Sequence, residues 1–294
     1  MIRLGVAGWS YPDWEGIVYP ARKTRSFDRL AYLARFFDTL EINTSFYRIP
    51  EPAYAASWAA RVRDRPEFRF TVKLFQNFTH RRDELRPGDE AAFRGALDPL
   101  AAAGRLGAVL IQFPYSFRPT AESRDVMESI FEAFREYPLV VEVRHQAWAK
   151  EPFFDLLRAR QAGFCNVDQP GVARSLRPTE VVTSRVGYAR FHGRNARDWF
   201  RREGRDGRYD YLYAEEELAP WVDRIRRMAE QTADLFIIAN NHFRGKAPLA
   251  SLTLLSMLLG RRVEAPPDLV AAYPQIGPRV LTLPPKGQGS LFRD

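Results

Sequence analysis

Glu142 and Arg144 lie two residues apart in the short apolar stretch Leu139–Trp148, LVVEVRHQAW. A run of this kind is typical of a strand buried on both faces of a parallel sheet, and side chains two positions apart on a strand share a face. Charged side chains are almost never buried without partners. The pair therefore indicates either a polar site or a mutual salt bridge on the inner side of a strand.

Other apolar runs of the chain also end in polar residues. These are Glu41 and Asn43, Lys73, Gln112, Asn166 and Asp168, Arg190 and His192, and Asn240, Asn241 and His242. All four histidines stand at or just beyond such an end: His80, His145, His192 and His242. Random placement would scatter histidines over helices and turns, so this clustering is the strongest indication of a functional site in the sequence.

Three acids and three cations stand near these ends: Glu41, Glu142 and Asp168, with Lys73, Arg144 and Arg190. The acids and two inward-facing histidines could hold a divalent ion such as manganese, magnesium or zinc. The cations would neutralise the acids, which favours a metal-free network whose remaining N–H groups bind an anion. A network that only maintains the geometry of the fold is the structural alternative.

Aromatic side chains form a second group near the same ends. We expect Trp9, Tyr11, Trp14, Tyr47 and Trp148 to contact substrate, because flat rings beside cations suit the stacking of bases or sugar faces. Packing in the core is the alternative for each ring. The arginine-rich loop that follows His192, residues 193–210, suits a phosphate backbone, and a solvated loop is its plainer interpretation.

The elements that must position these residues alternate along the chain. The predicted strands are Ile2–Trp9, Thr39–Ser45, Phe68–Leu74, Ala108–Phe113, Leu139–His145, Phe164–Asp168, Gly187–His192 and Leu235–His242. Stretches with helical spacing separate most of them, which predicts an α/β fold of the closed (β/α)₈, or TIM barrel, type. The sixth unit is irregular, because Gln169–Arg185 contains Pro170, Gly171 and Pro178. We expect a loop or one short turn there.

The 294 residues fit one barrel domain, residues 1–260, followed by a Pro-rich C-terminal extension, residues 261–294. This extension is expected to lie along the outside of the barrel or to be partly disordered. No apolar run approaches the length of a membrane span, and no signal-peptide pattern precedes the first strand, which predicts a cytoplasmic protein without a membrane partner. A single cysteine, Cys165, excludes an internal disulfide. The net charge of +8 favours anionic partners such as phosphates or nucleic acid.

With these motifs in view, the chain resembles the YecE-like family of barrel proteins, known as domain of unknown function 72. The resemblance rests on GWSYPDWEGIVYP, EINTSFYRIP, FTVKLFQNFTH, LIQFP, VEVRHQAW, the Asp168 segment, RFHGR and ANNHFRGKA, which occur in this order over roughly residues 1–260. It implies a (β/α)₈ barrel and supplies no settled reaction. Ala239 departs from the family pattern, which usually has an aromatic residue there.

The last residues form a separate motif, Gln288–Phe292, QGSLF. It is similar to the short peptide with which bacterial DNA-processing proteins bind the sliding clamp, with Gln288 as anchor and Leu291 and Phe292 for an apolar pocket. Gly289 replaces the usual leucine. A frayed terminus is the alternative.

These observations lead to three functional hypotheses. The first is an enzyme on a phosphate-bearing substrate, most plausibly nucleic acid, with hydrolase-like acid and base chemistry. Its catalytic residues would be Glu142 or Asp168 as base and His192 or His242 as acid. Its substrate-binding residues would be Glu41, Asn43, Lys73, His80, Gln112, Arg144, His145, Arg190, Asn240, Asn241 and the five aromatic residues named above. No cofactor is required. The second hypothesis is a metal-dependent isomerase or lyase on a small sugar-like metabolite, and the third is a binding module without catalysis.

Overall fold

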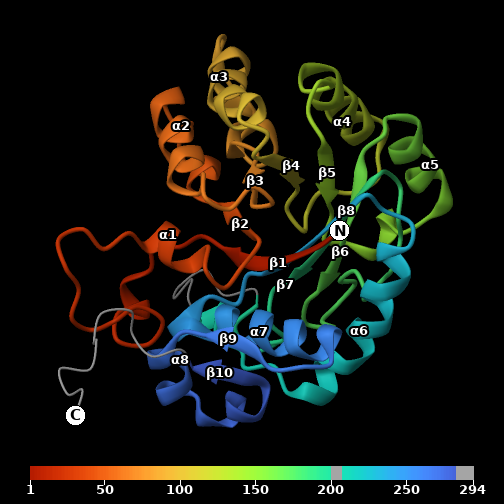
Figure 1. Cartoon of the computed structure of the whole chain (residues 1–294). Coiled ribbons are helices and arrows are strands. Elements are labelled where there is room, and N and C mark those ends of the chain that lie inside the picture. The colour runs from red at the N-terminus through yellow and green to blue at the C-terminus, as the bar shows by residue number, and fades with distance from the viewer. Residues whose placement is uncertain (200–206, 283–294) are drawn as a thin grey trace, which may run out of the picture.

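The computed structural model describes residues 1–199 and 207–282. Its centre is a closed barrel of eight parallel strands arranged in chain order (Figure 1). The strands are β1 (Ile2–Ala7), β2 (Thr39–Ile42), β3 (Arg69–Lys73), β4 (Leu106–Gln112), β5 (Leu139–Glu142), β6 (Gly163–Asp168), β7 (Val186–Phe191) and β8 (Asp234–Ala239). The predicted barrel is therefore confirmed, and several predicted strands end one to three residues earlier than expected.

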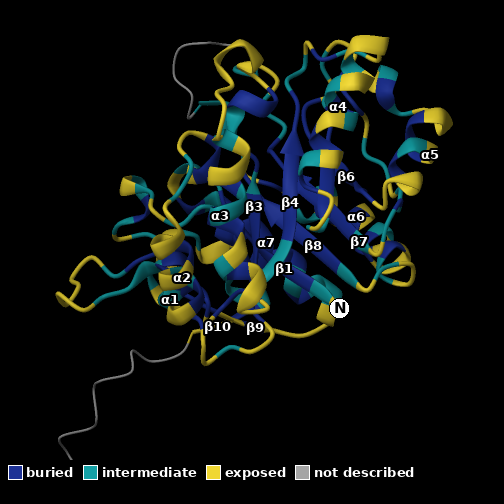
Figure 2. Ribbon diagram, turned by 90° about the horizontal axis from the view of Figure 1, so that it is seen from above, coloured by how far each residue is buried: buried dark blue, intermediate teal, exposed yellow. Residues whose placement is uncertain are grey.

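Helices surround the strands, as Figure 1 shows. They are α1 (Arg29–Leu33), α2 (Pro52–Arg61), α3 (Asp89–Ala102), α4 (Ala121–Ala133), α5 (Glu151–Ala159), α6 (Glu215–Ala229) and α7 (Lys246–Leu259). In α6 the apolar side chains from Leu218 to Met228 recur at helical spacing and are buried, and acidic residues occupy its first turn, where they complement the helix dipole. Figure 2 shows the result, a buried barrel whose covering helices expose their outer faces.

The sixth unit contains no helix, as predicted. Residues 169–185 run back in extended form from β6 to β7. The buried Asn166 side chain holds this segment, because its Oδ1 accepts from Val181 N at 2.8 Å and its Nδ2 donates to Val181 O at 2.9 Å. A polar side chain on the outer face of β6 thus replaces part of the cover that a helix provides elsewhere.

The segment after α7 is described as far as residue 282. It forms β9 (Val263–Ala265), α8 (Pro267–Ala272) and β10 (Val280–Thr282), and β9 and β10 pair in parallel. Ala265, Leu269 and Val280 are buried and join the hydrophobic core on the side of α7. Residues 263–282 thus pack against α7, and the division into a barrel domain and an extension stays a prediction. The predicted clamp-binding residues Gln288, Leu291 and Phe292 lie outside the described residues, so that interaction stays a prediction.

Within the described residues, none of the helices combines the length and the apolar character needed to cross a membrane.

Candidate functional site

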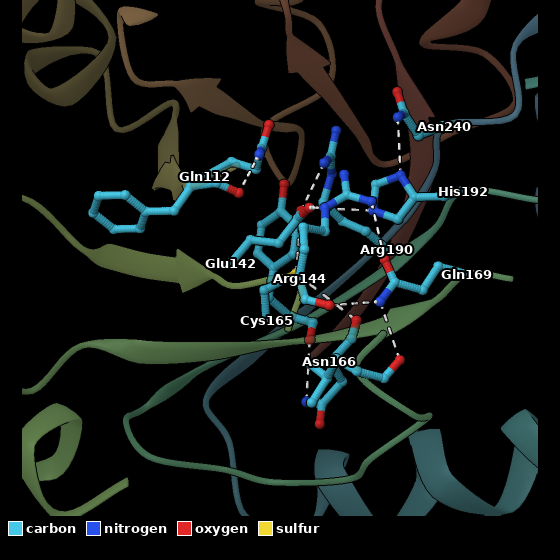
Figure 3. Close-up of polar contacts among 12 residues, drawn as sticks. Gln112, Glu142, Arg144, Cys165, Asn166, Gln169, Arg190, His192 and Asn240 are labelled. Carbon is cyan, nitrogen blue, oxygen red and sulfur yellow. Dashed lines mark hydrogen bonds and ion pairs between the residues drawn. The ribbon is translucent and has the colours of Figure 1, made fainter. Parts of the chain in front are cut away.

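Arg190 is the centre of a buried polar network inside the barrel (Figure 3). Its Nη2 donates to Glu41 Oε1 and its Nη1 donates to Glu142 Oε2, both at 2.6 Å. Tyr188, two residues earlier on β7, donates its hydroxyl to Glu41 Oε2 at 2.9 Å. All four side chains are at most 1% exposed. The predicted convergence of strand-end charges in one interior is therefore present for β2, β5 and β7.

A second layer lies nearer the mouth of the barrel. Arg144 places its Nε 2.5 Å from Glu142 Oε1 and donates from Nη1 to Gln169 Oε1 at 3.2 Å. His192 places its Nε2 3.3 Å from the same Glu142 oxygen. Because the Asn240 amide nitrogen donates to His192 Nδ1 at 3.0 Å, the ring proton resides on Nε2 and faces the carboxylate. Arg144 is the member of this layer that reaches solvent, with 13% of its side chain exposed.

Several buried polar atoms around Glu142 lack a partner with hydrogen-bond geometry. They are Glu142 Oε1, Arg144 Nε, Arg190 Nε and His192 Nε2. The contacts of Glu142 Oε1 are thus close ion-pair contacts whose angles do not align an N–H bond with the oxygen. Buried polar groups are normally hydrogen-bonded, so this cluster keeps unused hydrogen-bonding capacity.

The charges of this network suit binding better than proton transfer. Burial opposes ionisation of Glu142, but Arg144 and Arg190 hold the pKa of its carboxyl well below the ordinary value. Burial and the charge of Arg144 lower the pKa of His192 to about 3. At pH 7 Glu142 is therefore an ionised but very weak base and His192 carries no acidic imidazolium proton, which disfavours the general-base and general-acid roles expected for them.

Lys73, at the end of β3, differs from the other cations of the site. Its ammonium group lies 3.7 Å from the centroid of the Phe46 ring, and the side chain is half-buried. Burial and the neighbouring charge of Arg190 lower the pKa of Lys73 to about 7. Lys73 is thus the group of the network that exchanges protons near neutral pH.

Asp168 lies on the other face of its strand, away from Glu142. Its Oδ1 accepts from Tyr213 Oη at 2.7 Å, its Oδ2 accepts from Trp221 Nε1 at 2.7 Å, and Arg194 binds both oxygens at 2.9 and 2.7 Å. The expectation that Asp168 faces the same pocket is wrong, and so is that expectation for Asn166. The reason is the alternation of side chains along β6: Cys165 faces the inside of the barrel, so Asn166 and Asp168, which lie at alternate positions, point outward.

We predict a structural effect for Asp168→Asn. The amide cannot accept all these hydrogen bonds, so the free energy of unfolding should fall by about 2 kcal/mol. Urea unfolding measures it, with Asp155→Asn as control, because Asp155 forms an exposed pair with Arg158. Equal stabilities of the two variants would contradict the anchoring role of Asp168.

His145 also lies away from the Glu142 network. Its Nδ1 accepts from Ala147 N, and it borders a surface hollow of about 430 Å³ beside the loop after β6. A second hollow, of about 400 Å³, lies between Trp9 and Arg61. His80 is exposed, and its Nε2 lies 3.5 Å from Gln112 Nε2.

Two of the predicted stacking residues belong to the core. Trp14 and Trp148 are at most 1% exposed and donate their indole N–H groups to the carbonyl oxygens of His242 and Phe117. Their assignment as substrate-binding residues is therefore wrong, because a ring that is closed in and hydrogen-bonded to backbone offers no face to a ligand. The half-buried Tyr11 stacks on His242 with ring centroids 4.4 Å apart.

The remaining predicted contact residues are spread around the mouth. Trp9 is half-buried against Trp58, and Tyr47 is 59% exposed. Asn43 is half-buried, and the buried Asn241 donates to Tyr211 O.

Tyr188, Gln169 and Trp199 contact the network but were not among the predicted site residues. Tyr188 could have been found, because it stands two positions before Arg190 and must share its face. Trp199 has its ring centroid 6.2 Å from that of His192 and 5.6 Å from the Arg144 guanidinium carbon, and no sequence pattern links it to either.

A metal centre has little support in these donor atoms. Among the described residues, no three or more His, Cys, Asp or Glu side chains gather as metal ligands. The oxygens of Glu41 and Glu142 face arginine and tyrosine donors instead. The donor set thus favours an anion over a divalent cation.

Comparisons with known proteins give the same fold. Residues 3–272 match the family described as "Protein of unknown function DUF72". The UPF0759 protein YunF of Bacillus subtilis is 30% identical over 275 residues, which cover 88% of this chain and 95% of that protein. The UPF0759 protein YecE of Escherichia coli K12 is 31% identical over 153 residues, 51% of each chain.

Two crystal structures of DUF72 family proteins are similar throughout. The Thermotoga maritima protein has 31% identity and a TM-score of 0.76, over 88% of this chain and 99% of that one. The Enterococcus faecalis protein has 25% identity and a TM-score of 0.77, over 88% and 96%.

Proposed function

The chain belongs to the DUF72 family, and because this membership carries no assigned activity we propose one from the site itself: an enzyme that holds a phosphate-bearing substrate at the barrel mouth. The observation that carries this proposal is the charge count of the network. Two carboxylates, Glu41 and Glu142, are paired with two guanidiniums, and the ammonium of Lys73 lies near them without an ion pair among the described residues. Protonation of Lys73 leaves one positive charge in excess, which an anionic group would balance.

Arg144 is the residue best placed to contact that group. Its Nε and Nη1 face Glu142 and Gln169, whereas its Nη2 has no hydrogen-bond partner among the described residues. The side chain reaches solvent at the mouth, and Glu142 fixes the orientation of the guanidinium. A positioned arginine binds phosphate more strongly than a mobile surface cation, because less freedom is lost on binding.

More specifically, we propose nucleic acid as the phosphate-bearing substrate, and the net charge of +8 supports this choice. The depth of the network restricts how such a polymer could bind, because Glu142 and Arg190 are at most 1% exposed. A terminal phosphate or an everted nucleotide fits this depth better than a continuous duplex. A cytoplasmic location is part of the same proposal.

We predict that Arg144→Ala weakens binding of inorganic phosphate about tenfold or more, since a charge-assisted contact of this kind is worth about 1.5–3 kcal/mol. Titration calorimetry measures the affinity. Arg160→Ala is the matched control, because it removes the same charge from a surface pair with Glu128.

Equal losses in the two variants, or no phosphate binding by the wild type, would contradict the proposed site. Binding of single-stranded DNA, measured by fluorescence anisotropy, tests nucleic acid as the substrate. If single-stranded DNA does not bind at low salt, nucleic acid is excluded as the substrate, and a small phosphate compound is left as the candidate.

A further inference from the structure

Lys73 is left without a polar partner although two carboxylates lie near it. Each oxygen of Glu41 and Glu142 already faces another group: Arg190 and Tyr188 for Glu41, and Arg144 and Arg190 for Glu142. No hydrogen bond or ion pair reaches Lys73 Nζ from the part of the chain that the structure describes. A lysine that only stabilised the barrel would pair with a carboxylate, because an unpaired buried charge is costly.

The surroundings of this amine favour its neutral form. Burial and the like charge of Arg190 lower its pKa although the Phe46 ring, 3.7 Å from Nζ, is a contact that suits the cation. With a pKa of about 7 the amine is half neutral at pH 7, whereas a lysine at 10.5 would be neutral in roughly one molecule in 3,000. Only the neutral amine is a nucleophile.

The place of Lys73 in the barrel also suits a reactive group. It closes β3 at the carboxyl end of the barrel, the face on which barrel enzymes carry their active sites. Arg144, on the loop after β5, lies near enough for its positive charge to contribute to the lowered pKa of Lys73. An electrophilic substrate that carries a negatively charged group could thus contact the Lys73 amine and the Arg144 guanidinium at the same time.

We infer that Lys73 is a nucleophile that forms an imine with a small aldehyde or ketone carrying a negatively charged group. This rests on the proposed function, because Arg144 would hold the negative group. The Nζ lone pair attacks the carbonyl carbon and forms the C–N bond. The two amine hydrogens then leave with the carbonyl oxygen as one water molecule, and the product is a C=N bond between substrate and Lys73. No oxidant, reductant or metal is consumed.

Reductive trapping tests this on the intact protein. Sodium cyanoborohydride reduces any imine to a stable amine, and peptide mass mapping locates the label. The chain has five lysines, Lys23, Lys73, Lys150, Lys246 and Lys286, so the assignment is unambiguous. Three aldehydes serve as probes: glycolaldehyde phosphate, glyoxylate and the uncharged glycolaldehyde. The exposed Lys150 is the internal reference that corrects for the intrinsic reactivity of each aldehyde.

We expect label at Lys73 to exceed label at Lys150 by 100-fold or more at pH 7 with an anionic aldehyde. The trapping rate should rise with pH and reach half its maximum near pH 7. Arg144→Ala removes one of the charges that lower the pKa of Lys73, so it should reduce the ratio somewhat for every aldehyde, and about tenfold more for the anionic aldehydes than for glycolaldehyde. Lys73→Arg should abolish label at this position and keep the label at Lys150. The preferred anionic aldehyde identifies the substrate's charged group as phosphate or carboxylate.

Similar labelling of Lys73 and Lys150 by all three aldehydes would overturn the inference. The wild-type protein alone also tests the inference, even if a variant fails to fold: a trapping rate at Lys73 without a midpoint near pH 7 would contradict it. Absence of label at Lys73 with inorganic phosphate still bound would refute the imine and leave the proposed anion site. Loss of phosphate binding as well would refute both.

Discussion

Arg190→Met is expected to lower the free energy of unfolding by about 3–5 kcal/mol, the usual cost of removing one partner from a buried ion pair. Arg190 neutralises Glu41 and Glu142 at once, each at 2.6 Å, in a region where no carboxylate is exposed. Without it Glu41 keeps no ion pair among the described residues and Glu142 keeps only that with Arg144, so the buried negative charge is no longer balanced. Chemical unfolding at pH 7 measures the loss.

A surface arginine provides the control for Arg190→Met. Arg160→Met removes a partly exposed surface pair with Glu128 and should cost about 1 kcal/mol or less. If the triple variant Arg190→Met, Glu41→Gln, Glu142→Gln recovers most of the stability, the loss in the single variant comes from uncompensated charge. A loss in Arg190→Met no larger than in the control would show that the network is not the electrostatic centre of the barrel.

The second large effect has the opposite sign. Lys73→Met is expected to raise the free energy of unfolding by about 2 kcal/mol at pH 6, because it removes a half-buried, unpaired cation. A pKa near 7 in the folded chain and 10.5 in the unfolded chain means that the unfolded chain binds more protons between these values. Wild-type stability therefore rises with pH through this window, and the gain in Lys73→Met shrinks as pH rises toward 10.5.

Urea unfolding of both proteins between pH 6 and pH 9.5 measures this dependence. Lys150→Met serves as control, since Lys150 is exposed on the loop before α5. A difference between wild type and Lys73→Met that stays constant over this range would contradict a lowered pKa of Lys73. Greater stability together with the loss of imine trapping would show that the unpaired lysine is retained for chemistry.

The sequence alone determined the barrel and half of its polar centre. Apolar runs alternating with helical stretches predict parallel strands covered by helices, and the carboxyl ends of such strands must meet at one face. Glu41, Glu142 and Arg190 therefore converge, as expected. The same argument placed Lys73 and His192 beside them.

Only the tertiary structure decided which side chains of a strand face inward. Strands of a covered parallel barrel are apolar on both faces, so alternation shows which residues share a face without showing which face is inside. In β6 the register with Tyr188 turns Cys165 inward and sends Asn166 and Asp168 toward the loop and helix that cover the strand. Likewise, the burial of Trp148 and the unpaired state of Lys73 depend on contacts between residues far apart in the chain, because space and charge partners are shared in three dimensions and local spacing carries no record of them.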